Sequence, residues 1–299
     1  MHGVARAESA VYQRLSGLSR AGRLRWLGAF FLCVAVLFLL VNREAYQGSF
    51  TDDDLGNMYN ATSPLSMYLH TIAIPSISAG GSSRAAAYLY YYALVRLAGM
   101  HLWPYIAGIH AIHLLNVLLV WVLASTLGAE LLGSCAAALF YVFHASAFGV
   151  YWSPMYVFDL LCATFVLLAL LAYIRGHDLL CLVFFWLSLK SKETAILFPL
   201  VLAAYEVTLG QRRWKRLIAY FAVSGVLCGF ALRDNAVRND VYTFRFTVAA
   251  LWTRSRTRRC TCRARQARCR TSSTRSPRHG PPMSIARRPG LPRRPPATA

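Results

Sequence analysis

Long uninterrupted apolar runs constrain this sequence more than any other feature. The first is WLGAFFLCVAVLFLLV at residues 26–41, and the others occupy residues 103–127, 131–150, 155–174, 178–189, 194–209 and 217–232. A helix needs about 20 apolar residues to cross the hydrocarbon core of a bilayer. Charged residues make up only 15% of the chain, whereas soluble domains carry about a quarter. The runs therefore predict an all-α fold, a polytopic transmembrane helical bundle of about seven spans.

The distribution of basic residues predicts how this bundle is oriented. Arginines crowd residues 1–25, before the first run, and the cluster QRRWKR at residues 211–216 falls on the same side when the spans are counted. Cytoplasmic loops are enriched in Lys and Arg, so we expect the N-terminus to be cytoplasmic. Residues 42–102 then form a long first outer loop, and the aromatic, basic segment at residues 84–99 predicts a helix lying in the membrane interface. The expected location is a bacterial inner membrane, since the composition indicates a GC-rich gene.

The membrane module is expected to end near residue 240, because residues 241–299 have a different composition. After Leu251 the chain holds 14 Arg with no Lys and no acid, and subtracting these 14 charges lowers the net charge from +20 to +6. Basic tails often bind nucleic acid or anionic lipid. This one contains little besides Arg, Pro, Thr, Ser and Cys, which is what a frameshift in a GC-rich gene would produce. We therefore expect a disordered tail and no nucleic-acid partner, and a truncated, inactive chain stays an open alternative.

Three adjacent carboxylates, Asp52, Asp53 and Asp54, occur in the motif SFTDDDLGNM just beyond the first apolar run. Clustered carboxylates repel one another unless a cation, a proton or a substrate is close. The motif therefore indicates either a solvated loop or one half of an active site. With the predicted topology, further ionisable residues gather at the same outer face, where such groups are costly and usually functional. These residues are Arg84, Asp159, Lys190, Lys192, Glu193 and Arg233.

The segment SLKSKETAILFP, residues 188–199, has two interpretations. It is either a polar loop at the water interface or a cationic pocket for an anionic head group. A phosphate leaving group needs nearby positive charge, and an acceptor hydroxyl needs a carboxylate to remove its proton. A lipid-linked sugar phosphate would use both kinds of group. A proton-coupled transporter would use the same ingredients.

Several motifs, in the same order along the chain, resemble those of the GT-C glycosyltransferases, which are integral membrane enzymes that use polyprenyl-phosphate sugars. GSFTDDDLGNM resembles their Phe-x-x-Asp-Asp motif, and Arg84 stands where an Arg begins an interfacial helix. His113 and Asn116 resemble a His-x-x-Asn pair of the second span. YWSPMYVFDLLCATFVLLALLAY and LSLKSKETAILFPLVLAAYE are similar to later helices. The resemblance covers residues 25–240 and is nearest to the protein O-mannosyltransferase-like group.

The resemblance implies roles for individual residues. Asp53 would be the catalytic base with Asp54 beside it, and Asp52 is an extra acid that would shift the register by one if it took part. Lys192 and Arg233 would hold the lipid phosphate. Lys190 and Arg84 would stand behind them, Glu193 would orient or neutralise Lys192, and His113 and Asn116 would support the site or simply join two helices. Some members of the class bind a divalent metal and many need none, so the sequence leaves the metal open.

The predicted function is transfer of a sugar from a polyprenyl-phosphate donor to a hydroxyl of an acceptor protein or glycan at the outer face. The sequence contains no Gly-rich phosphate loop and no nucleotide-binding fingerprint, which favours a lipid-linked donor over a nucleotide sugar. The alternative is a non-enzymatic transporter or flippase for a lipid-linked anion. Both functions place the protein in a lipid bilayer.

Overall fold

The computed structural model describes residues 19–74, 84–144 and 149–237. Every regular element in these residues is a helix, so the predicted all-α class is confirmed for the described part of the chain. The Arg-rich segment at residues 241–299 and most of the basic N-terminal segment lie outside the described residues.

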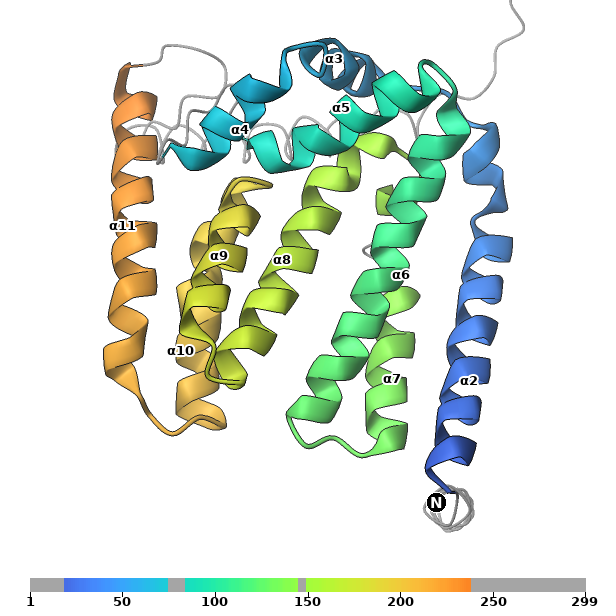
Figure 1. The fold of residues 1–299 in the computed structure, drawn as a ribbon, viewed down its shortest axis with the longest axis vertical. Helices are drawn as coiled ribbons and strands as arrows, with labels where there is room; N and C mark the ends of the chain where they lie inside the picture. The colour runs from blue at the N-terminus through green and yellow to red at the C-terminus, as the bar shows by residue number, and fades with distance from the viewer. Residues whose placement is uncertain (1–18, 75–83, 145–148, 238–299) are drawn as a thin grey trace, which may run out of the picture. The chain divides into compact units, whose positions relative to one another are not determined.

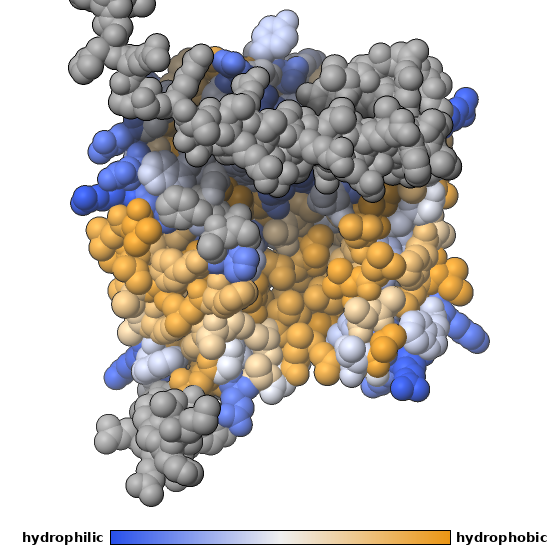
Figure 2. Space-filling view, turned by 180° about the vertical axis from the view of Figure 1, so that it is seen from behind, coloured by the Kyte–Doolittle hydropathy of each residue, from blue (hydrophilic) through white to orange (hydrophobic). Residues whose placement is uncertain are grey.

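Within the described residues, three helices are long and apolar enough to cross a membrane: α2 (Arg20–Val41), α6 (Leu102–Thr126) and α8 (Val157–Ile174, extended by the 3₁₀ turn η4 at Pro154–Tyr156). Helix α2 begins at the N-cap Ser19, whose side chain accepts a hydrogen bond from the amide of Gly22 at 3.2 Å. Figure 2 shows a hydrophobic band with hydrophilic residues above and below it. A band of this kind is what the hydrocarbon core of a bilayer requires, and it is consistent with a membrane protein.

The other predicted runs form helices that fall short of the length or apolarity of a simple span. They are α7 (Leu131–Val142), α9 (Asp178–Leu189), α10 (Phe198–Thr208) and α11 (Trp214–Val237). Helices α7 and α9 are apolar but have 12 residues each. Length and composition therefore support three membrane crossings, and the four further crossings stay a prediction.

Helix α8 is the centre of the bundle. It contacts α6 on one side and α9 on the other, while α7 packs on α6 and α10 packs on α11 (Figure 1). Small side chains allow the close approach of α8 to its neighbours, because Ala169 and Ala172 are buried against Cys181 and Phe185 of α9. At membrane depth such close packing replaces the hydrophobic effect as the main attraction between helices.

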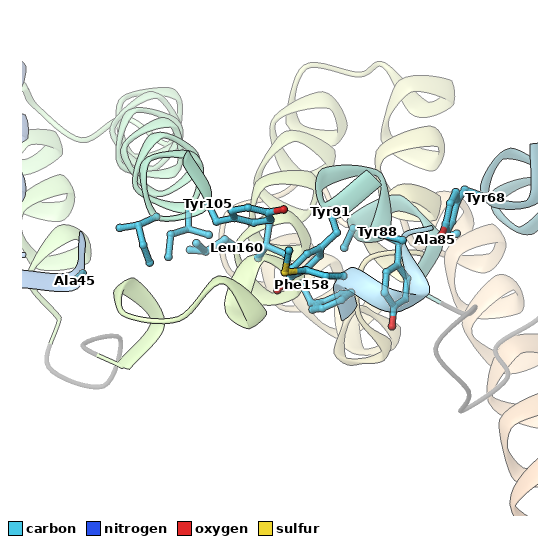
Figure 3. Close-up of a cluster of buried hydrophobic side chains, with 14 residues drawn as sticks. Ala45, Tyr68, Ala85, Tyr88, Tyr91, Tyr105, Phe158 and Leu160 are labelled. Carbon is cyan, nitrogen blue, oxygen red and sulfur yellow. The ribbon is translucent and has the colours of Figure 1, made fainter. Parts of the chain in front are cut away.

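Three short helices lie across one end of the bundle: α3 (Asp52–Asn60), α4 (Leu65–Ala73) and α5 (Ala85–Ala98) (Figure 1). They follow α2 through the 3₁₀ turn η1 (Arg43–Gln47). Helix α5 buries Tyr88 and Tyr91 against Phe158 at the start of α8, with ring centroids 5.2 and 6.1 Å away (Figure 3). This aromatic cluster holds α5 against the start of α8.

Candidate functional site

A cleft of about 380 Å³ lies where α3, the first turn of α5, η4 and the start of α8 meet. Five of the residues that the sequence singled out line it, although they come from distant parts of the chain: Asp52, Asp53, Arg84, Asp159 and Lys192. Its wall is completed by Gly56, Asn57, Asn60, Met155, Tyr156 and Phe158.

The three adjacent aspartates form the first turn of α3. Thr51 is the N-cap: its hydroxyl accepts a hydrogen bond from the amide of Asp54 at 3.2 Å, and its own amide donates to Asp54 Oδ2 at 2.9 Å. This reciprocal pair is a capping box. The positive end of the helix dipole stabilises carboxylates in the first turn. Stabilisation at the start of a helix is therefore a physical reason for three adjacent acids, besides the solvated loop and the active site that the sequence suggested.

Asp54 lies beneath the cleft rather than in it. Its side chain is 0% exposed and accepts hydrogen bonds from Tyr91 Oη at 3.1 Å and Ser153 Oγ at 3.2 Å, besides those from Thr51. Burial raises the pKa of Tyr91 far above its ordinary value, and the negative charge of Asp54 raises it further. Both oxygens of Asp54 are engaged, so this carboxylate ties α3 to α5 and to the segment before η4.

Asp52 and Asp53 are exposed and line the cleft. Within the described part of the chain neither carboxylate has a hydrogen-bond or ion-pair partner. These two side chains are therefore the free anionic groups of the cleft. Of the predicted pair Asp53 and Asp54, the structure places Asp53 where it can meet a ligand and Asp54 where it fixes the helix.

Arg84 precedes α5 and forms a two-point ion pair with Glu193, with Nε to Oε1 at 2.9 Å and Nη2 to Oε2 at 3.0 Å. Its guanidinium also lies 5.5 Å from the centre of the Phe158 ring. Burial opposes the charge of Arg84, but the carboxylate of Glu193 outweighs burial and raises the pKa of the guanidinium. Glu193, which the sequence analysis assigned to Lys192, thus forms its ion pair with Arg84.

Lys192 donates from Nζ to the carboxylate of Asp159 in the first turn of α8. Both side chains line the cleft and both are partly exposed, at 26% for Lys192 and 39% for Asp159. A pair this exposed exchanges partners at little cost, since surface ion pairs contribute at most about 1 kcal/mol. The sequence placed Asp159 at this face without giving it a role.

The other predicted residues lie away from the cleft. Lys190 is buried and donates from Nζ to the carbonyl of Ile74 at 2.6 Å, which joins the end of α9 to the end of α4. Asn116 donates to the carbonyl of Leu160 at 3.0 Å and so joins α6 to α8. His113 is buried with its ring centre 4.5 Å from that of Tyr151. Arg233, near the end of α11, is exposed and is not a lining residue.

Sequence reasoning missed the asparagines of the cleft wall. Asn57 accepts a hydrogen bond from Tyr88 Oη at 3.1 Å, and Asn60 donates to the same oxygen at 3.4 Å. Asp53, Asn57 and Asn60 are separated by four and three positions, so they share one face of α3. That spacing would have identified them if the segment had been recognised as a helix.

The chemistry available in the cleft follows from these charges. Free carboxylates can accept a proton or bind a cation, and the partly exposed Lys192 and Arg84 can exchange a carboxylate partner for a phosphate. The residues that the structure describes contain no group of three or more His, Cys, Asp or Glu placed to hold a metal ion.

Comparison with known proteins adds no identity to this geometry. No family model, no curated protein and no solved structure matches the chain. The function is therefore argued from the cleft and from the order of the sequence motifs.

Proposed function

We propose that the chain is the N-terminal module of a GT-C type membrane glycosyltransferase, and that the cleft is its reaction site. The observation that carries the proposal is the cleft itself, which is lined by the free carboxylate of Asp53 and by the cations Arg84 and Lys192. The order of the sequence motifs supports it. The donor would be a polyprenyl-phosphate sugar and the acceptor a hydroxyl of a protein or glycan.

The proposed topology has seven crossings, with the cleft on the outer face of a bacterial inner membrane. The exposed basic residues Arg23 and Arg25 of α2 lie at the end of the bundle opposite α3 (Figure 1). The connection between α10 and α11, with Arg212 and Arg213, lies at that same end. The positive-inside rule then makes that end cytoplasmic. Residues 42–102 would be the outer segment, which contains the short helices α3, α4 and α5.

In the proposed reaction the acceptor hydroxyl oxygen attacks the anomeric carbon, its proton passes to Asp53, and the bond from that carbon to the phosphate oxygen breaks. Polyprenyl phosphate leaves with the bonding electrons, so the increase in negative charge falls on its oxygens. Lys192 and Arg84 would stabilise that charge. Each already has a carboxylate partner, so the donor phosphate would take over part of the role of Asp159 or Glu193.

The test uses the full chain in nanodiscs with a radiolabelled polyprenyl-phosphate sugar. Sugar transfer to a Ser/Thr peptide and release of free sugar by water are both counted, because hydrolysis needs no particular acceptor. Asp53→Asn should lower the rate by about 100-fold or more, the usual contribution of a general base. Asp52→Asn is the matched control, with the same chemical change one position earlier in the same turn, and it should stay within tenfold. A chelator shows whether a divalent ion takes part.

The outcomes separate the alternatives. A large loss with Asp52→Asn and none with Asp53→Asn would move the base by one position. If neither variant affects transfer and hydrolysis, the proposed reaction is wrong. Movement of the labelled lipid between leaflets, measured in vesicles and unaffected by Asp53→Asn, would favour the transporter.

A further inference from the structure

The connection between α10 and α11, residues 209–213, forms a basic surface with the first turn of α11 at the end of the bundle remote from the cleft (Figure 1). Arg212, Arg213 and Lys215 are exposed here. The two carboxylates nearby are already engaged: Glu206 is buried, and Asp178 accepts from Arg216 Nε at 3.0 Å. The three exposed cations therefore have no carboxylate partner among the described residues.

This connection has a fixed backbone. Glu206 of α10 accepts from Tyr173 Oη at 2.7 Å and from the backbone amide of Arg213 at 3.0 Å. Gly210 fits against the same carboxylate so closely that a Cβ on it would lie 2.5 Å from Oε2. Arg212 has a φ of 57°, a conformation that non-glycine residues adopt rarely. A buried carboxylate thus fixes the backbone of the connection that carries Arg212 and Arg213.

Contacts with α8 place the connection at the level where that helix ends. The guanidinium of Arg216 lies 4.4 Å from the centre of the Tyr173 ring, and its Nη2 donates to the Tyr173 carbonyl at 3.5 Å. Tyr173 is in the last turn of α8, one of the helices long and apolar enough to span a membrane. Residues 209–213 therefore lie where the head groups of the bilayer begin.

An apolar groove of about 590 Å³ runs from this basic connection along α10 and α11. Trp214, the first residue of α11, is half-exposed, lines the groove and directly follows Arg213. Tryptophan at the end of a helix is typical of the membrane interface. The groove is lined only by apolar side chains, namely Ala203, Trp214, Leu217, Ile218, Phe221 and Ala222.

We propose that this surface is a binding site for an anionic phospholipid, with the phosphate on Arg212, Arg213 and Lys215 and an acyl chain in the groove. The charge selects an anionic head group, and basic surfaces beside membrane helices bind such head groups. The groove requires that the anion carry a chain, which a soluble phosphate lacks. The site is independent of the proposed transferase reaction, since it lies at the opposite end of the bundle from Asp53.

The experiment compares retained lipid in the full chain by native mass spectrometry, with dioleoyl phosphatidylglycerol and dioleoyl phosphatidylcholine as probes. Arg212→Gln combined with Arg213→Gln should weaken phosphatidylglycerol binding about tenfold or more, from the loss of two cations at the membrane surface. The matched control is Arg23→Gln with Arg25→Gln, which removes the same charge at the same end of the bundle, away from the groove. It should stay within twofold.

A second variant tests the groove without changing charge. Ala222→Phe places a ring into the groove from an exposed position, so it should reduce phosphatidylglycerol retention while the thermal unfolding temperature stays constant. Soluble glycerol phosphate should fail to compete. Equal losses in the two arginine variants, unchanged retention in Ala222→Phe, or equal retention of the two lipids would each overturn the proposal.

Discussion

Replacing Asp54 with alanine tests whether this carboxylate is structural and its neighbour functional. Asp54 accepts hydrogen bonds from Thr51, Tyr91 and Ser153 while fully buried. Loss of the capping interaction costs about 1 kcal/mol. Leaving the buried Tyr91 hydroxyl without an acceptor costs about 1–3 kcal/mol, and losing the hydrogen bond of the half-buried Ser153 hydroxyl costs about 0.5–1.5 kcal/mol. The expected total is about 3–5 kcal/mol, which lies in the range for breaking a buried charged network.

The assay is amide hydrogen exchange of α3 in nanodiscs, because exchange reports the opening of one helix without requiring reversible unfolding of a membrane protein. A loss of about 3–5 kcal/mol corresponds to about 150- to 5,000-fold faster exchange. If α3 is less stable than that, its amides would exchange at the rate of an open chain. The matched control is Asp53→Ala. It removes an exposed carboxylate from the same turn and should cost only the dipole interaction, about 0.3–1 kcal/mol.

The reasoning would be refuted if the two alanine variants changed the exchange of α3 equally. It would also fail if Asp54→Ala left exchange within twofold of the unmodified chain. A further comparison with Asp54→Asn keeps the side-chain volume and one oxygen. The amide turns a donor towards Thr51, so this variant should fall between the other two.

Three other changes test neighbouring features. Gly210→Ala should lower the thermal unfolding temperature and weaken phosphatidylglycerol retention, because its Cβ would collide with Glu206; unchanged retention would contradict the fixed connection. Folding raises the pKa of Tyr91. Its contribution to the stability of the folded chain is therefore complete below a pH of about 10, the pKa of an unfolded tyrosine, and is lost as the pH rises further. Tyr91→Phe should reduce this alkaline loss of stability in a pH series of unfolding temperatures. Lys192→Met should lower sugar transfer more than tenfold and cost less than about 1 kcal/mol of stability, because its ion pair is partly exposed; a large stability loss would make the residue structural.

The sequence was sufficient for the all-helical class and for the positions of the membrane-facing helices, because apolar runs have an unmistakable composition. It was insufficient for the segment after α2. SFTDDDLGNM has too few apolar residues to show helical periodicity, yet Thr51 followed by Asp54 is a capping box that marks a helix start. Reading that signal would have turned the aspartates from a loop into the first turn of α3.

Partner choice was the part of the site that sequence reasoning could not settle. Glu193 and Lys192 are neighbours in the chain, which suggested that they pair, but they turn to different partners, Arg84 and Asp159. These pairings depend on how α5, α8 and η5 (Glu193–Leu197) meet in space. Composition and spacing along one segment carry no information about contacts between residues far apart in sequence.

The roles of the three aspartates follow from the geometry of a helix turn. Successive side chains of an α-helix project about 100° apart, so three adjacent identical residues cannot share one environment. The third turns towards Tyr91 and the bundle, where donors occupy both of its oxygens. A carboxylate bound in this way cannot take a proton from a substrate without first giving up its partners. In the proposed reaction the base would therefore be Asp53 or Asp52, and the comparison of their asparagine variants is the experiment that distinguishes these two residues.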